Sequence, residues 1–254
     1  MLQNKLSGGL TGSTLKWLAI IAMVINHFGD TLLEAVILHA PYQAFTDTQF
    51  GFISNCHYVF HAIGRISMPI FCFLIVEGFL HTRDAKRYLL RLVLFALISE
   101  IPYDLAFGES AFDLNQQNVF FTLAAGLLTL MVMDRMKTHW AVVFFAPVLM
   151  SVLTFYGNFD GSYYGVLMMA LFYILREKRL TKCVSILALQ LAIMLVFGET
   201  FGLNDFFAII PLILIYFYNG RRGMRLKYFF YAFYPVHLLI FGLLAVFVII
   251  PMYQ

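Results

Sequence analysis

Residues 63–107 decide the fold class of this chain, and they read IGRISMPIFCFLIVEGFLHTRDAKRYLLRLVLFALISEIPYDLAF. Two apolar runs flank a short basic segment at 81–91, and each run is close to the ~20 residues that a helix needs to cross a bilayer. Membrane β-strands would instead show alternation over ~10 residues, a pattern that is absent here. The stretch therefore predicts two membrane-spanning helices joined by a basic turn.

The rest of the chain repeats this organisation. Its composition is 61% hydrophobic and only 12% charged, about half the charged fraction of a soluble domain. Nine apolar segments are expected to span, at 15–38, 58–80, 88–107, 118–135, 139–156, 161–175, 182–198, 204–218 and 228–250. No gap is long enough for a second domain, so residues 1–254 are predicted to form one all-α integral membrane bundle of about nine transmembrane helices.

Basic residues predict which way this bundle sits in the membrane. Sixteen of the seventeen Lys and Arg residues lie near the N-terminus or in alternate gaps, at 81–91, 134–139, 176–182 and 219–227. Because Lys and Arg concentrate on the cytoplasmic side, we expect a cytoplasmic N-terminus and a C-terminus outside. Short basic loops beside apolar helices indicate membrane lipids as partners and give no indication of nucleic-acid binding.

The first apolar segment carries candidate catalytic groups, since ionisable residues at membrane depth usually have a function. Lys16 and His27 are eleven residues apart, which at ~100° per residue places them on one helix face. Asp30 follows His27 at i+3 and is expected to orient the imidazole or hold it charged. The alternative is that Lys16 only anchors the helix end and His27 only makes a hydrogen bond inside the bundle.

Arg65 is the one basic residue inside an apolar segment. Pro69 cannot donate to the Arg65 carbonyl, so a kink is expected between them. An unpaired guanidinium at membrane depth is costly, and Asp30, Glu100 or Asp104 is expected to pair with it. Arg65 is predicted to serve catalysis, although an ion pair that only fixes packing is the alternative.

Further polar groups are candidates for substrate binding. Glu100 and Asp104 lie one helical turn apart and would form an anionic vestibule at the outer end, unless they are simply solvated. His237 follows Pro235 as a second deep imidazole, or as a satisfied interhelical hydrogen bond. The substrate-binding candidates are Glu77, Glu100, Asp104, Asn118 and His237. Asn115, Gln116 and Gln117 extend the outer polar wall, whereas His39, His57 and His139 are expected in loops or at the interface.

This arrangement suits transfer of an acyl group. A histidine can act as general base towards an attacking amine or hydroxyl, while a cation stabilises the developing oxyanion. Basic side chains at the inner face would bind the phosphates of a donor such as acetyl-CoA, and the candidates are Lys16, His81, Arg83, Arg87 and Arg91. No Walker-type, GxGxxG or HExxH motif is present and the three cysteines lack metal-type spacing, so no metal is expected.

Two other classes of function are weighed against an enzyme. Intramembrane His, Asp and Arg also mark ion and proton pathways, which would suit a secondary transporter or proton-coupled channel. Against it, the chain shows no pair of Gly/Pro-interrupted segments in two matching halves. A membrane assembly factor would explain the topology but would give the deep charges no purpose.

Four blocks of sequence resemble the TraX family, named for the conjugative-pilus pilin N-acetylase. They are GLTGSTLKWLAIIAMVINHFGD (9–30), the 63–107 stretch, QNVFFTLAAGLL (117–128) and YAFYPVHLLI (231–240). The spacing from Lys16 to His27 also resembles the basic-residue-to-histidine pattern of the wider acyltransferase-3 superfamily, where the first residue is usually Arg.

The resemblance implies a bacterial inner-membrane acetyltransferase. Such an enzyme would move an acetyl group from cytoplasmic acetyl-CoA to an amine or hydroxyl reached from outside, on a pilin N-terminus, a sugar or a lipid. By position, His27 would be the catalytic base, and the other family positions without firm roles are Arg65, Glu77, Glu100, Asp104, Asn118 and His237. A homo-oligomer is compatible with this expectation.

Overall fold

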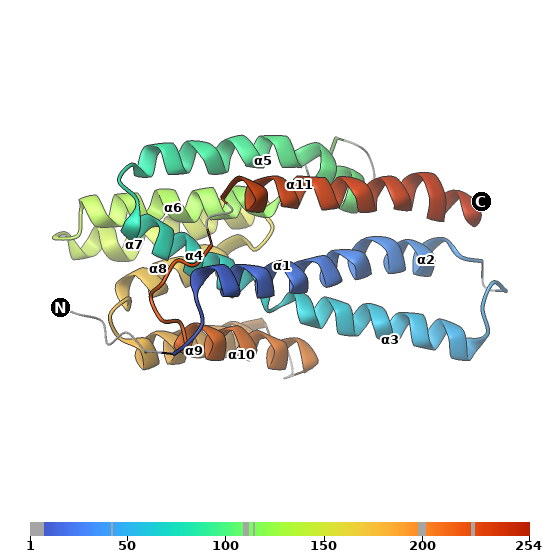
Figure 1. Ribbon diagram of the computed structural model, residues 1–254, viewed down its shortest axis with the longest axis horizontal. Helices are drawn as coiled ribbons and strands as arrows, with labels where there is room; N and C mark the ends of the chain where they lie inside the picture. The colour runs from blue at the N-terminus through green and yellow to red at the C-terminus, as the bar shows by residue number, and fades with distance from the viewer. Residues whose placement is uncertain (1–7, 42, 109–111, 114, 198–201, 225–226) are drawn as a thin grey trace.

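The computed structural model describes residues 8–254 except 42, 109–111, 114, 198–201 and 225–226 (Figure 1). Within that part of the chain every regular element is a helix and no β-strand is present, which confirms the all-α class. Lys5 and Arg225, two of the basic residues used to predict the topology, lie outside the described residues.

The helices follow the predicted apolar segments closely. Their bounds are α1 Gly12–Phe28, π-helix η1 Gly29–Leu33, α2 Glu34–His39, α3 Asp47–Gly64, α4 Ser67–His81, α5 Ala85–Phe107, α6 Val119–Arg135, α7 Trp140–Tyr156, α8 Ser162–Ile174, α9 Arg179–Phe197, α10 Leu203–Tyr216, α11 Lys227–Leu244, π-helix η2 Ala245–Ile249 and 3₁₀-helix η3 Ile250–Met252.

The described residues contain four helical stretches that are long and apolar enough to cross a membrane. They are Gly12–His39, Asp47–His81, Arg179–Val196 and Tyr228–Met252. The shorter apolar helices are α7, α8 and α10. The chain is therefore a helical membrane protein, whereas nine crossings and the orientation of the termini stay predictions.

The second predicted span begins earlier than expected, at Asp47 rather than at residue 58. Thr46 caps α3 by accepting the N–H of Gln49, and the Gln49 side chain accepts the N–H of Thr46 in return. Such a capping box satisfies free N–H groups of the first turn. Hydropathy alone located only the apolar part of this helix.

The helical stretch Asp47–His81 is interrupted at Arg65 and Ile66, where the sequence predicts a kink before Pro69. α3 ends at Gly64, and α4 begins at Ser67, which makes Pro69 its third residue. A proline is tolerated in the first turn because no intrahelical donor is needed there. Arg65 consequently lies at the α3–α4 junction and is exposed, not in the interior of a continuous helix as predicted.

The basic connections gather at one end of the bundle. Figure 1 shows the α4–α5, α6–α7 and α8–α9 links at the same end as the N-terminus, while α2, the start of α3 and the end of α11 extend at the opposite end. The link after α10 joins the basic end through hydrogen bonds from Gly12 N–H to Arg221 O and from Ser13 N–H to Arg222 O, at 2.8 and 2.9 Å. This arrangement agrees with the alternation of basic gaps in the sequence.

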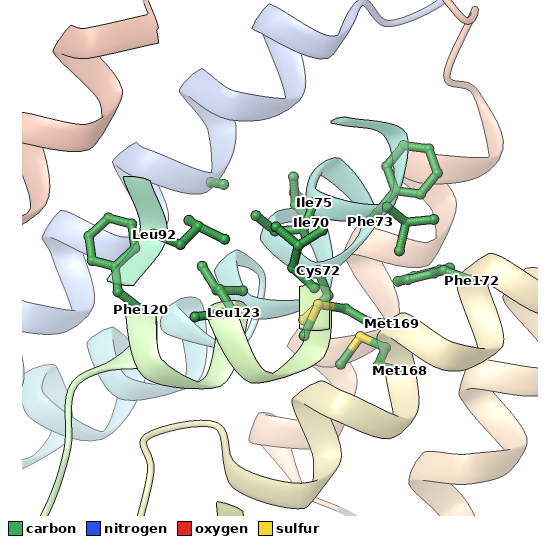
Figure 2. Packing of buried hydrophobic residues seen from close by; sticks show 14 of the residues in the cluster. Ile70, Cys72, Phe73, Ile75, Leu92, Phe120, Leu123, Met168, Met169 and Phe172 are labelled. Atoms are coloured by element: carbon green, nitrogen blue, oxygen red, sulfur yellow. The ribbon is translucent and has the colours of Figure 1, made fainter. Parts of the chain in front are cut away.

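The main core lies between α4, α5, α6 and α8. Figure 2 shows Phe73 of α4 beside Phe172 of α8, and their ring centroids are 5.5 Å apart. Met169 of α8 packs against Gly126 of α6 so closely that an added Cβ would lie 1.8 Å from the methionine methyl. This packing fixes α6 and α8 against α4, and α5 packs along both α6 and α11.

Candidate functional site

Two buried histidines meet where α1 ends and α11 passes beside it. His27 Nδ1 lies 2.7 Å from His237 Nε2, although the residues are 210 positions apart in sequence. The two imidazole planes differ by only 2°. The sequence indicated two deep imidazoles, but no pattern in it showed that they form a pair.

The carbonyl of Phe233 determines where the protons of this pair lie. His237 Nδ1 is 2.7 Å from the Phe233 oxygen. A carbonyl oxygen only accepts hydrogen bonds, so His237 Nδ1 carries a proton and donates it. In the neutral pair His237 Nε2 then accepts from His27 Nδ1–H, which leaves the lone pair on His27 Nε2. The arrangement is that of a base whose tautomer is fixed by a second group.

Aromatic rings surround the pair. Phe107 of α5 and Tyr234 of α11 approach His27 edge-on, with centroids 5.4 and 6.0 Å from the imidazole centroid. The Tyr234 hydroxyl lies by the backbone N–H of Val119 and has no hydrogen-bond acceptor among the described residues. The Tyr234 ring thus packs on His27 while its hydroxyl keeps an unused donor, and nothing in the sequence pattern distinguished this tyrosine from a packing residue.

Asp30 does not contact His27, so the expectation that it orients this imidazole is wrong. Directly after His27 the helix widens into a π-helix over Gly29–Leu33, which turns Asp30 towards α3. The Asp30 carboxylate lies 3.0 Å from His61 Nδ1 and 3.3 Å from His57 Nε2, and it accepts a 2.6 Å hydrogen bond from Asn26. His57 accordingly lies on α3 and not in a loop.

Arg65 has no carboxylate within ion-pair distance in the described part of the chain, so the predicted pairing with Asp30, Glu100 or Asp104 is wrong. Its Nη2 atom lies 3.5 Å from Nε2 of His61. The reason is its position at the α3–α4 junction, from which the side chain reaches back along α3. Arg65 thus belongs with His61 to a group of polar side chains around Asp30 that does not include His27. No three His, Cys, Asp or Glu residues among those described have the geometry to hold a metal.

A cavity of about 460 Å³, which we call the inner hollow, opens at the basic end between α1, α4, α5, α6 and α11. Lys16, His81, Arg91 and Arg222 line its polar part, and Glu77 is the one carboxylate among its described lining residues. Apolar side chains line the remainder, which extends to Tyr234.

The sequence identified only some of the cations of the inner hollow. Lys16, His81 and Arg91 line it as predicted for a donor site, whereas Arg83 and Arg87 do not. Arg87 forms a 3.0 Å ion pair with Asp84 and its side chain is 81% exposed. Arg222 was missed as an individual candidate because only its place in a basic gap pointed to it.

A second cavity of about 420 Å³, the outer hollow, lies at the other end of the bundle between α5, α7 and α8. Asp104, Asn115 and Gln116 line it together, as the sequence led us to expect. Asp104 accepts a 2.8 Å hydrogen bond from the backbone N–H of Asp113, which also lines the cavity. This hollow therefore presents carboxylates and amides to a ligand.

Glu100 and Asn118 bind each other instead of lining the outer hollow. The Asn118 amide donates to the Glu100 carboxylate and, at 2.8 Å, to the carbonyl of Ala96. Its oxygen also accepts the N–H of Phe120 at the start of α6. Both side chains are buried. They link α5 to α6 and line neither hollow, and their predicted contact with a substrate stays a prediction.

The loop between α7 and α8 forms one wall of the outer hollow. Asn158, Gly161 and Ser162 have positive φ angles of 50°, 77° and 38°. Strained backbone of this kind is common at functional sites. Gln117 holds the loop by donating to Asn158 O and accepting from Asp160 N–H, at 3.0 and 2.7 Å. Burial raises the pKa of Asp160 to about 6, opposed by the Gly161 N–H and the Arg65 guanidinium.

The histidine pair lies between the two hollows. Phe107 lines the outer hollow and Tyr234 lines the inner hollow, and the rings of both contact His27. Among the described residues none lines both cavities. One aromatic side chain therefore separates His27, whose Nε2 lone pair is free, from each of the two hollows.

A family model described as TraX protein matches residues 11–245, a range that includes His27, His237 and both hollows. The chain belongs to the TraX family. This membership confirms the resemblance found in the four sequence blocks. The likeness to the acyltransferase-3 superfamily has no support from these comparisons.

One similar protein is named for fimbrial assembly. The chain is 29% identical over 194 residues to the "Probable fimbrial assembly protein FimC, serogroup H1" of Dichelobacter nodosus, and the match covers 69% of this chain and 78% of the relative. No solved structure matches the chain.

Proposed function

We propose that this TraX-family protein is a membrane acetyltransferase. It transfers an acetyl group from cytoplasmic acetyl-CoA in the inner hollow to an amine or hydroxyl that reaches the outer hollow. The observation that carries this proposal is the His27–His237 pair between two cavities at opposite ends of the bundle. The proposed location is the bacterial inner membrane, where the donor is available on one side only.

The inner hollow suits the donor in shape and charge. Its cationic side chains, among them Lys16, Arg91 and Arg222, match the phosphates of a CoA molecule. Its apolar walls match the pantetheine arm, which would bring the thioester towards Tyr234. An excess of cations over the single lining carboxylate of Glu77 favours an anionic ligand.

His27 and Tyr234 have the chemical properties that the reaction needs. The free Nε2 lone pair of His27 can act as a general base or as a nucleophile, and His237 holds the ring in that tautomer. The Tyr234 hydroxyl can donate to the oxyanion that develops on the thioester carbonyl. Tyr234 thereby takes the role that the sequence assigned to Arg65, which lies with His61 instead.

The acceptor remains a class rather than a single compound. The name of the FimC relative refers to fimbrial assembly, so a pilin N-terminus is one candidate and a sugar or lipid is another. Asp104, Asp113 and the amides of Asn115 and Gln116 would hydrogen-bond an amine or hydroxyl at the outer hollow.

The test is acetyl transfer by the purified protein in lipid vesicles, with radiolabelled acetyl-CoA and a panel of peptide, amino-sugar and lipid acceptors. His27→Ala is expected to abolish transfer while the variant still inserts and folds. His139→Ala is the matched control because this histidine is exposed on the α6–α7 link, and it should retain activity. Full activity of His27→Ala would remove His27 from the mechanism.

A secondary transporter or proton-coupled channel is the second candidate. It is favoured by the Asp30, His57 and His61 cluster, which neither hollow includes. The same vesicles separate the two functions. Solute uptake or proton flux without any need for acetyl-CoA, together with no labelled product, would favour transport.

A further inference from the structure

We propose that the acetyl group crosses the protein on His27, as a covalent acetyl-imidazole, and does not pass directly from donor to acceptor. This inference rests on the proposed acetyltransferase function and specifies its chemical route. It follows from the separation of the two hollows and from the position of His27 between them.

A line of aromatic contacts runs between the two hollows, which share no lining residue among those described. Tyr234, which lines the inner hollow, and Tyr103, which lines the outer hollow, are each 4% exposed. Tyr103 packs on Phe107 with ring centroids 5.1 Å apart, and Phe107 packs in turn on His27. Tyr103, Phe107, His27 and Tyr234 thus form a continuous layer of rings between the donor and acceptor cavities.

Direct transfer does not fit this layer. An acceptor atom must come within about 3–3.5 Å of the carbonyl carbon in order to attack it. A thioester in the inner hollow and an acceptor in the outer hollow lie on opposite sides of the rings. His27 contacts a lining ring of each cavity, and the proposed route requires Tyr234 or Phe107 to move so that the imidazole meets one substrate at a time.

The first half-reaction begins at the free nitrogen of His27. The Nε2 lone pair attacks the thioester carbonyl carbon, a C–N bond forms and the C–S bond breaks. The CoA thiolate leaves with the bonding electrons and takes a proton from solvent at the basic end. His27 Nδ1 passes its proton to His237 Nε2, so the acetyl-imidazole is neutral and the charge rests on His237, whose Nδ1–H donates to Phe233 O.

The second half-reaction reverses these steps towards the outer hollow. The acceptor nitrogen or oxygen attacks the acetyl carbon, the C–N bond to His27 breaks, and the electron pair returns to Nε2. His237 Nε2 returns its proton to His27 Nδ1, and the proton lost by the acceptor goes to solvent at the outer end. Covalent catalysis of this kind gives ping-pong kinetics.

Labelled CoA provides a test that needs no acceptor. The reconstituted protein is mixed with acetyl-CoA and radiolabelled CoA, and label is expected to exchange into acetyl-CoA. With radiolabelled acetyl-CoA alone, rapid quenching and peptide mass spectrometry should locate one acetyl group on the peptide that contains His27. The label should disappear when acceptor or hydroxylamine is added. His27→Ala should lose both signals, and His139→Ala should keep them.

The outcomes distinguish this route from the function on which it rests. Transfer to an acceptor without exchange and without labelled protein overturns the covalent route and leaves the acetyltransferase in place. Exchange that persists in His27→Ala overturns the assignment to His27. Absence of exchange, of labelled protein and of transfer to every acceptor overturns both the route and the proposed function.

Discussion

His27 Nδ1 and His237 Nε2 are 2.7 Å apart, and the second nitrogen of His237 is tied to the carbonyl of Phe233 at the same distance. By fixing the tautomer of His237, the Phe233 carbonyl also determines which nitrogen of His27 carries the proton. In the proposed function, His27 reacts with the acetyl group, whereas His237 positions His27 and takes up its Nδ1 proton during the reaction. This division of roles leads to different expectations for substitutions at the two sites.

Replacement of His237 by Ala should lower kcat for acetyl transfer by roughly hundredfold, in the range typical of lost general base assistance. KM for acetyl-CoA should change little, because His237 lines neither hollow. His237→Gln should recover only part of kcat, since its amide oxygen can still accept the hydrogen bond from His27 Nδ1–H but cannot take the proton. Steady-state kinetics of the three proteins check this; a raised KM with unchanged kcat would contradict it.

Substitution of Tyr234 by Phe removes one buried hydroxyl and keeps the ring that packs on His27. If this hydroxyl donates to the oxyanion, kcat should fall by about 10²–10³-fold, as for other lost oxyanion donors. Tyr231→Phe is the matched control, because Tyr231 also lines the inner hollow, whereas the rings that contact His27 in the described part of the chain are those of Phe107, Tyr234 and His237. Equal effects of the two substitutions would mean that the hydroxyl of Tyr234 has no special role.

Arg91 and Arg87 lie one turn apart on α5 but should differ in their effect on the donor. Arg91 lines the inner hollow, while Arg87 is paired with Asp84 in solvent. Arg91→Gln should raise KM for acetyl-CoA by about tenfold, the loss expected for a charge-assisted hydrogen bond to phosphate. Arg87→Gln should leave KM unchanged. Titration with acetyl-CoA and with dephospho-CoA thioester measures both values.

Much of the architecture followed from hydropathy and charge. Apart from α3 and α4, which share the predicted segment 58–80, the helices lie where the apolar segments predicted them, and the basic links share one end. The start of α3 was misplaced because residues 47–57 are too polar to look like a membrane span, although the Thr46–Gln49 capping box begins a helix there. The capping box therefore marks where this helix begins, and the hydropathy pattern does not.

The sequence identified many residues of the candidate site but not which of them contact one another. An ideal helix keeps Asp30 near His27, and only the π-helix Gly29–Leu33 turns it to His57 and His61. The pairing of His27 with His237 depends on how α1 and α11 pack, over 210 intervening positions. Single-sequence periodicity contains no information about such long-range contacts.

Asn118→Ala should destabilise the fold without a direct effect on either substrate. The substitution removes the donors to Glu100 and Ala96 O and the cap of α6. Loss of a cap and a buried hydrogen bond costs about 1–3 kcal/mol of unfolding free energy. Asn115→Ala, at an exposed position, is the control. Thermal unfolding in detergent should show a lower midpoint for Asn118→Ala alone, and an unchanged midpoint would refute the linking role.

Asp160 should make stability depend on pH in the mildly acidic range. Burial raises its pKa from 3.8 to about 6 in the folded protein. Between these values the folded state binds more protons than the unfolded state, so this residue lowers stability as the pH rises from roughly 4 to roughly 6. Asp160→Asn cannot ionise and should lose this dependence. The unfolding midpoints of both proteins should be measured across that pH range. They should be equal at the acidic end and should separate towards neutral pH, where the variant is the more stable protein. Parallel curves would show that Asp160 does not titrate in this range.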